Sequence, residues 1–248
     1  MIFPSTVAVF ASLLLAPSFV LASPRAQSAS ASASVPDTTP KPSPAEALET
    51  AFRNLRASKE SSLAAVVTTR NELIDGGCAP IIVLFARGTT EPGNVGDDVG
   101  PQFFDQLSLL RPGKVIVQGT NDYPASIWDY LLGGSDTAAV SMASQVVRAA
   151  AQCKTSKIVL SGFSQGGQVV HKAADLIPAS LYPLIGAIVI FGDPDLGERF
   201  PGSLNANLKS FCHFGDLICE AGLPIPLPPH ATYEDDAPEA AAFVASRL

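Results

Sequence analysis

From Cys78 onward the chain alternates short apolar runs with segments of helical periodicity, and this alternation constrains the fold more than any other feature. Five aliphatic and β-branched runs have the length of strands: 81–86, 115–118, 158–160, 185–191 and, less clearly, 208–212. Four other segments space their apolar residues as helices do: 102–110, 137–152, 165–177 and 238–248. Strands that are apolar along their whole length are typical of a parallel sheet covered on both faces. The sequence therefore predicts an α/β fold, one three-layer domain around a central, mainly parallel five-stranded sheet.

The first part of the chain predicts two segments that lie outside this domain. Residues 1–22 carry no charge and contain an apolar stretch before the small residues Ala22 and Ser23. This pattern predicts a signal peptide cleaved near Ala22, although the usual basic start is missing. Residues 23–44 are rich in Ser, Ala, Pro and Thr, and we expect a disordered linker because such a segment buries little apolar surface.

The folded domain is expected to span residues 45–248 and to begin with a helical extension, 45–77. Apolar residues at spacings of three and four predict one short helix around 48–55. A weaker pattern predicts a second helix over 61–74, which the glycine pair at 76–77 would end.

Composition excludes several classes of protein. The 248 residues include 16 Lys and Arg against 23 Asp and Glu, a net charge of -7, and no segment concentrates basic residues, so we expect no nucleic-acid partner. Hydrophobic residues make up 47% of the chain, yet no internal run reaches the ~20 apolar residues of a membrane span, so we expect no stable membrane insertion. The four cysteines form no C-x-x-C pair and indicate two disulfides, hence a secreted, extracellular protein. Spacing alone leaves three pairings open.

Residues 162–166, Gly-Phe-Ser-Gln-Gly, match the G-x-S-x-G pattern of a nucleophilic serine. The motif follows the predicted strand 157–161 and precedes a helix rich in small residues, as that chemistry requires. Glycines on both sides permit a strained turn that lifts the Ser164 hydroxyl off the sheet. We therefore expect Ser164 to be a nucleophile. The alternative is a glycine-rich turn without catalysis.

A nucleophilic serine needs a base, and the chain contains three histidines. His171 lies on the same predicted helix as Ser164, about 10 Å further along its axis, which is too far to take the hydroxyl proton. His213 adjoins Cys212 at the end of a predicted strand. The expected chain order in this architecture is nucleophile, acid, histidine, and His230 fits that order. His230 is the predicted base.

The acid has three candidates. Asp193 and Asp195 follow a predicted strand, which is a common place for an acid in this architecture. Asp216 lies between Cys212 and Cys219, in a tight loop that a disulfide would hold. Because the acid must orient the imidazole, a cross-linked loop favours Asp216, and Asp193 and Asp195 remain as alternatives.

Four stretches in this order resemble the secreted fungal cutinases: residues 78–96 (CAPIIVLFARGTTEPGNVG), 162–166, the Asp216 loop between two cysteines, and Pro229-His230. The resemblance extends from the first of these stretches to the C-terminus. It implies an α/β-hydrolase-type sandwich. It also implies a catalytic triad of Ser164, Asp216 and His230, which places Asp216 above its rivals.

The same resemblance assigns supporting residues. It implies two disulfides, Cys78 with Cys153 and Cys212 with Cys219. It places the oxyanion hole at the backbone N–H of Gln165 and at the backbone N–H and hydroxyl of Thr89. Arg87, Glu91 and Asn94, from the same motif as Thr89, are expected to hold the loop rather than to take part in the chemistry.

The loop before His230 alternates apolar side chains with prolines, which stiffen it. We expect Leu223, Ile225 and Leu227 to contact an aliphatic acyl chain; the alternative is that they pack inward. Weaker candidates for an opposite wall are Tyr123, Ile127, Leu131 and Leu132.

The sequence thus predicts a secreted, monomeric serine esterase that hydrolyses cutin or similar aliphatic polyesters, or lipid-like esters, through an acyl-enzyme. No cofactor and no metal are expected. Acetylxylan esterase is the related alternative, and a catalytically silent secreted binder is the alternative of another class. The extension 45–74 also resembles extra N-terminal helices of some lidded cutinase relatives, so it is a candidate lid over the Ser164 cleft.

Overall fold

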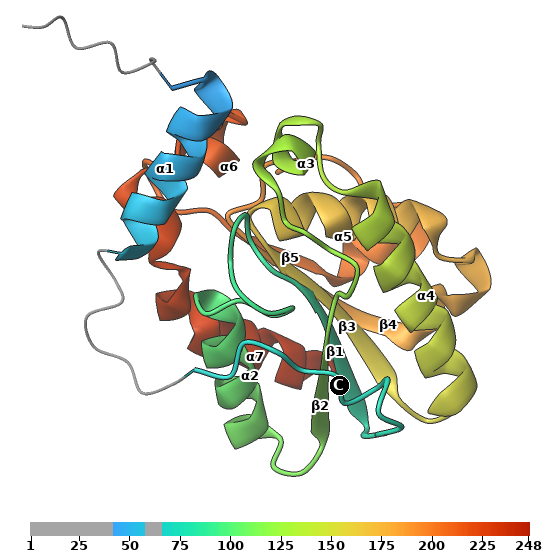
Figure 1. Cartoon of the computed structure of the whole chain (residues 1–248). Helices are drawn as coiled ribbons and strands as arrows, with labels where there is room; N and C mark the ends of the chain where they lie inside the picture. The colour runs from blue at the N-terminus through green and yellow to red at the C-terminus, as the bar shows by residue number, and fades with distance from the viewer. Residues whose placement is uncertain (1–41, 58–65) are drawn as a thin grey trace, which may run out of the picture. The chain divides into compact units, whose positions relative to one another are not determined.

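The computed structural model describes residues 42–57 and 66–248, and its centre is a parallel sheet (Figure 1). The sheet has five strands in the order β2-β1-β3-β4-β5, and every neighbouring pair is parallel. The strands are β1 (Ile81–Ala86), β2 (Val115–Gly119), β3 (Lys157–Phe163), β4 (Ile185–Phe191) and β5 (Leu208–Phe211). The predicted α/β class and sheet are confirmed, and all the strands arise from the apolar runs.

Two pairs of helices cover the two faces of this sheet, which completes three layers (Figure 1). One pair is α2 (Val99–Leu110) and α7 (Ala237–Arg247), and the other is α4 (Asp136–Gln152) and α5 (Gln165–Leu176). Each pair encloses a separate apolar core against the sheet. Because the central strands β1 and β4 are apolar throughout, successive side chains supply both cores in alternation.

Shorter elements connect the strands and helices at both edges of the sheet. The short helices are α3 (Ile127–Leu131) and α6 (Leu217–Ala221). The 3-10 turns are η2 (Ala179–Leu184), η3 (Gly202–Asn207), η4 (Pro228–Ala231) and η5 (Tyr233–Asp236).

Helix α1 (Pro44–Ala57) starts inside the stretch predicted as linker, and its first residues explain why. Ser43 accepts a hydrogen bond from the Glu46 N–H (3.3 Å), and the Glu46 carboxylate accepts one from the Ser43 N–H (2.7 Å). This reciprocal pair is a capping box, and proline is well suited to the first helical position that follows it. The predicted signal peptide and residues 23–41 lie outside the described residues.

The second predicted helix, over 61–74, is wrong for the described part of that segment. Residues 66–70 form no helix, and Asn71 forms an antiparallel bridge with Gln118 of the edge strand β2. The Gly119 N–H donates to the Arg70 carbonyl (2.9 Å). β-branched residues before Arg70 disfavour a helix, and an edge strand offers backbone groups that need partners. Residues 61–65 lie outside the described part of the chain.

Two disulfides link segments next to the sheet. Cys78, just before β1, bonds to Cys153 at the end of α4, with 5.6 Å between their Cα atoms. Cys212 bonds to Cys219 and closes the loop between β5 and α6. In residues 42–57 and 66–248, no helix has the length and apolarity needed to cross a membrane.

Candidate active site

The candidate residues gather where the loops leave the carboxyl ends of the parallel strands. Ser164 follows β3 directly, Thr89 lies in the loop after β1, and Asp216 lies in the loop after β5. His230 belongs to η4, further along the same rim. In parallel sheets this edge is where ligands bind, because the loops from neighbouring strands converge there.

The turn at Ser164 is sharp and strained. Its φ of 53° lies in the left-handed region, which is uncommon for a residue with a side chain. A Cβ on Gly166 would lie 2.0 Å from the Ala86 carbonyl oxygen, and one on Gly162 would lie 2.3 Å from the Gly166 oxygen. Glycine is therefore required at both positions by close packing of backbone on backbone, which explains the motif.

Ser164, His230 and Asp216 form a continuous series of hydrogen bonds. The Ser164 Oγ lies 2.9 Å from His230 Nε2, and His230 Nδ1 lies 2.8 Å from Asp216 Oδ2. All three side chains are buried, with 1%, 2% and 0% of their surfaces exposed, respectively. An arrangement of hydroxyl, imidazole and carboxylate at these distances can transfer a proton from serine to histidine.

The electrostatics fix which nitrogen of His230 carries a proton. Burial raises the pKa of Asp216, but hydrogen bonds and charge from His230, with donors on Tyr233 and Ile218, outweigh it and lower the pKa overall. An ionised carboxylate only accepts, so His230 Nδ1 donates to it. His230 Nε2 is then the acceptor for the Ser164 hydroxyl.

The rival candidates have other partners. His171 Nε2 bonds to Asp193 Oδ2 (3.0 Å), and the imidazole stacks on the Phe200 ring. His213 Nε2 bonds to Asp236 Oδ2 (2.7 Å). The structure therefore brings Asp216, and neither Asp193 nor the other two histidines, into the series with Ser164.

The predicted oxyanion residues lie beside the serine. Gln165 begins α5, and its side-chain amide donates to the Ser126 carbonyl (2.6 Å) and, at 3.4 Å, to the Thr89 Oγ1. Because that amide nitrogen can only donate, the Thr89 hydroxyl keeps its own proton for another acceptor. The Thr89 side chain and Ser164 line the same cavity.

Glu91 and Asn94 hold the loop that carries Thr89. The Glu91 carboxylate accepts from the N–H groups of Gly88 (2.6 Å) and Asp98 (2.9 Å). Burial and the charge of Asp98 raise the pKa of Glu91 to about 7. Asn94 links the loop to the Arg70 backbone. Arg87 belongs to the same brace, since its Nε donates to the Glu91 carbonyl.

Helix α1 covers the serine. Phe52, 5% exposed, points its ring at His230 (6.4 Å between ring centroids) and at Tyr130 (6.0 Å). The cavity that Phe52 and Leu55 share with Ser164 and His230 offers only about 20 Å³ to a water-sized molecule, which is room for one water. This cavity leaves little room for an ester chain while α1 lies in this position.

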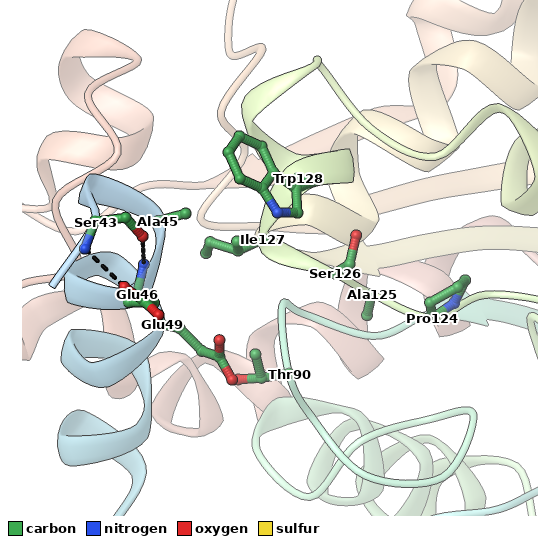
Figure 2. A pocket seen from close by; sticks show the side chains of 10 residues that line it. All are labelled: Ser43, Ala45, Glu46, Glu49, Thr90, Pro124, Ala125, Ser126, Ile127 and Trp128. Atoms are coloured by element: carbon green, nitrogen blue, oxygen red, sulfur yellow. Dashed lines mark hydrogen bonds between the residues drawn. The ribbon is translucent and has the colours of Figure 1, made fainter.

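Beside this contact, the charged side of α1 faces a groove. This groove has a volume of about 430 Å³, and Glu46 and Glu49 line it together with Thr90 and the loop from Pro124 to Trp128. Figure 2 shows how these side chains lie. The apolar contact of α1 with the domain is a small cluster: Ala45, Leu48, Phe52, Ile127, Tyr130 and Ile218.

The predicted substrate-contact residues separate into two groups. Leu223 and Ile225 are exposed, whereas Leu227 is half-buried. Ile225 and Leu131 line a groove of about 390 Å³ whose other wall is the Pro44–Ala51 face of α1.

Three of the weaker wall candidates have other surroundings. Tyr123 is buried and donates to the Arg87 carbonyl (3.0 Å), so it holds the loop and is no part of a wall. Ile127 is buried against α1 by its apolar packing with Phe52. Leu132 is exposed.

Sequence reasoning missed three aromatic residues that touch His230. Phe163, the variable residue of the serine motif, stacks on the imidazole (5.1 Å between centroids), and Phe52 covers it. Tyr233 donates a hydrogen bond to Asp216 Oδ2 (2.6 Å). The only sequence signal for Tyr233 was its place three residues after His230, and Phe52 was marked only as an apolar position of the helix predicted around 48–55.

A parallel sheet with a serine at a sharp strand-to-helix turn, next to histidine and aspartate from later loops, defines an α/β hydrolase. The family model described as Cutinase matches residues 77–248. The chain is 44% identical to a cutinase of Monilinia fructicola over 182 residues, which are 73% of this chain and 90% of that protein. It is 42% identical to a cutinase of Pyrenopeziza brassicae over 199 residues, 80% of this chain and 97% of that one. The chain belongs to the cutinase family.

Solved structures agree with this assignment. A Trichoderma reesei cutinase in complex with a C11Y4 phosphonate inhibitor is 41% identical, with a TM-score of 0.70 over 81% of this chain and 88% of that one. An acetyl xylan esterase shares the fold at 24% identity, with a TM-score of 0.56 over 69% of this chain and 99% of that one.

The two disulfides are expected to affect different properties. The Cys78–Cys153 bridge spans a sequence separation of 75, and on a chain-entropy estimate it stabilises by about 4 to 5 kcal/mol. The Cys212–Cys219 bridge spans a sequence separation of only 7 and stabilises by about 2.5 kcal/mol on the same estimate, but it encloses Asp216. Cys212→Ser/Cys219→Ser should lose mainly kcat, and Cys78→Ser/Cys153→Ser mainly melting temperature. If the two double variants lost kcat and melting temperature in the same proportion, this division would be wrong.

His171 is expected to act on stability alone, with a pH dependence. Burial lowers its pKa, but the hydrogen bond and charge of Asp193, with the charges of Asp195 and Glu198, raise it above 6.5 overall. A raised folded-state pKa stabilises the fold below about pH 6.5, and this contribution disappears as pH rises through the folded-state value. His171→Gln should therefore lose more unfolding free energy at about pH 5.5 than at about pH 8.5, with esterase turnover kept at both. A loss that is larger at the higher pH would contradict this.

Proposed function

We propose that the protein is a secreted serine esterase that hydrolyses the ester bonds of cutin or similar aliphatic polyesters. The observation that carries this proposal is the hydrogen-bonded series of Ser164, His230 and Asp216 at the carboxyl edge of a cutinase-family sheet. In this proposal the three side chains act as nucleophile, general base and orienting acid.

Acylation would begin with proton transfer from the Ser164 hydroxyl to His230 Nε2, as the Ser164 oxygen forms a bond to the ester carbonyl carbon. The carbonyl oxygen gains negative charge, and the Gln165 N–H with the Thr89 hydroxyl and N–H would stabilise it. As the intermediate collapses, the carbon–oxygen bond to the alcohol breaks, and His230 returns its proton to the leaving alcohol.

Deacylation would repeat these steps with water as the nucleophile. His230 takes a proton from the water, whose oxygen attacks the acyl-enzyme carbonyl, and the proton then returns to Ser164 as the acid leaves. Asp216 remains ionised throughout and stabilises the imidazolium that forms twice in each cycle. His230 takes and returns the proton in every transfer of this scheme.

An aliphatic substrate is supported by the apolar side chains that α1 faces across a groove. Leu131, Ile225 and the neighbouring prolines would be uncovered when α1 moves, and they suit an alkyl chain and offer little to a sugar. Relatives with identities above 40% are named cutinases, whereas the acetyl xylan esterase supports the fold alone. Hydrolysis of p-nitrophenyl esters from acetyl to palmitoyl, beside cutin and acetylated xylan, separates the two substrates. A preference for acetyl groups and xylan would overturn the cutinase assignment.

Secretion, a monomeric state and the division of the chain complete the proposal. We propose a signal peptide at 1–22, a linker from 23 that ends before α1, and a catalytic domain from α1 to the C-terminus. Two disulfides in the catalytic domain support an oxidising compartment.

Ser164→Ala tests the proposed nucleophile. The side chain lies at the edge of the sheet and not within either core, so the variant should fold with an unchanged melting temperature. Hydrolysis of p-nitrophenyl butyrate should fall ~10⁴-fold or more, because the three residues act as a unit. Ser144→Ala, which removes a hydroxyl from the exposed face of α4, is the matched control and should keep full activity. Residual hydrolysis above ~1% of the wild-type rate would rule out Ser164 as the nucleophile.

We also propose that α1 is a lid over the site. The cavity at Ser164 is too small for an ester chain while Phe52 lies on His230, and the apolar contact of α1 with the domain is limited to one small cluster. The helix can therefore be displaced without opening either main core.

A chain that begins at Val66 tests the lid, since the segment after residue 66 pairs with β2 and should be kept. This chain should gain more activity on bulky polyester than on a soluble short ester. Phe52→Ala in the full chain should also raise the ratio of activity on polyester to activity on the short ester. Arg53→Ala, on the exposed side of α1, should leave this ratio unchanged. An equal change on both substrates would overturn the lid.

A further inference from the structure

Tyr233 is the one buried phenol that bonds directly to the proposed acid. It is the first residue of η5, three residues after His230, and it is 1% exposed. Its hydroxyl lies 2.6 Å from Asp216 Oδ2, the same oxygen that accepts from His230 Nδ1 at 2.8 Å. The other oxygen, Oδ1, accepts from the Ile218 backbone N–H (3.1 Å). Both carboxylate oxygens of Asp216 are thus held.

The direction of the tyrosine hydrogen bond follows from its second partner. The His213 backbone N–H points at the Tyr233 hydroxyl oxygen (3.0 Å), and a backbone N–H can only donate. The phenol oxygen therefore accepts from His213 and gives its own proton to Asp216. With two donors on Oδ2, His230 Nδ1 must carry a proton, and His230 Nε2 is left to accept from the serine.

The tyrosine ring is fixed from several sides. The His213 imidazole stacks on it (4.2 Å between centroids, 22° between planes), and His213 Nε2 is tied in turn to Asp236 (2.7 Å). A Cβ on Gly192 would lie 2.8 Å from both the Tyr233 and His230 rings, so glycine makes room for both. The hydroxyl is therefore held in one place relative to the carboxylate.

We propose that Tyr233 is a positioning residue of the active site: its hydroxyl holds the Asp216 carboxylate in the orientation that meets His230 and shares the negative charge of that carboxylate. This inference rests on the proposed roles of Ser164, His230 and Asp216. The Tyr233 ring packs edge-on against His230 (5.9 Å between centroids), but its hydroxyl bonds to no reacting atom and acts through Asp216.

Tyr233→Phe keeps the ring and removes the hydroxyl. Without it, the carboxylate is less well oriented, so kcat on p-nitrophenyl butyrate should fall roughly tenfold with little change in KM, as expected for loss of one hydrogen bond to a charged group. The negative charge then faces His230 alone and favours the imidazolium, so the acid limb of the kcat/KM profile should move to higher pH. Tyr182→Phe, on η2, is the matched control and should change neither.

A second variant keeps the fold and reverses the direction of the effect. Fluorotyrosine at position 233, fluorinated next to the hydroxyl, retains the hydroxyl but makes it a stronger donor. Burial and Asp216 raise the pKa of Tyr233, which keeps the phenol protonated near neutral pH. The acid limb should then move to lower pH. If the acid limb of the kcat/KM profile stayed in place in both variants, or moved in the same direction in both, the proposal would be overturned.

A double-mutant cycle separates positioning from packing. In the Asp216→Asn background, Tyr233→Phe should cost no further kcat, because the tyrosine acts through the carboxylate. An equal loss in both backgrounds would assign Tyr233 to packing alone. Ser164→Ala decides the proposed function independently: if Ser164→Ala is inactive and Tyr233→Phe is neutral, only the tyrosine inference fails.

Discussion

The close approach of α5 to the ends of β1 and β3 is the constraint on which the active site depends. At Gly166 the backbone packs so tightly on the Ala86 carbonyl that no side chain fits. This approach forces Ser164 into a left-handed conformation, which costs on the order of 1 to 3 kcal/mol. The burial of most of α5 against the sheet offsets that cost. The same turn places Gln165 directly after Ser164 at the start of α5, so one packing contact positions the proposed nucleophile and a proposed oxyanion donor.

Each of the three histidines has an aspartate partner, and position alone separates their roles. His171 with Asp193 is buried between α5 and the loop after β4, and the pair at His213 stands behind Tyr233. Of the three, His230 with its aspartate is the pair that bonds to Ser164, the proposed nucleophile. A histidine–carboxylate pair is thus a common structural unit in this protein, and chemistry requires in addition a strained serine and nearby N–H donors.

The attachment of helix α1 over Ser164 also bears on function. Its capping box and helical periodicity are local features that favour a helix here. Phe52 packs it on the imidazole, and Ala45 and Leu48 pack in the same small cluster with Ile127 and Tyr130 of α3, while Glu46 and Glu49 line the groove in Figure 2. One small cluster, separate from both main cores, is the apolar attachment of this helix.

Patterns local to the sequence were enough to predict the sheet, its covering helices and the serine motif, because apolar periodicity and glycine requirements are properties of neighbouring residues. It also indicated Asp216 and His230 through chain order and resemblance. It misassigned 66–74, whose pairing with β2 depends on a strand more than 40 residues away. Tertiary structure alone decided the partners of the histidines, the cover of Phe52 and the hydrogen bond of Tyr233. These contacts join residues distant in the chain, and no local pattern encodes which side chains meet when loops converge.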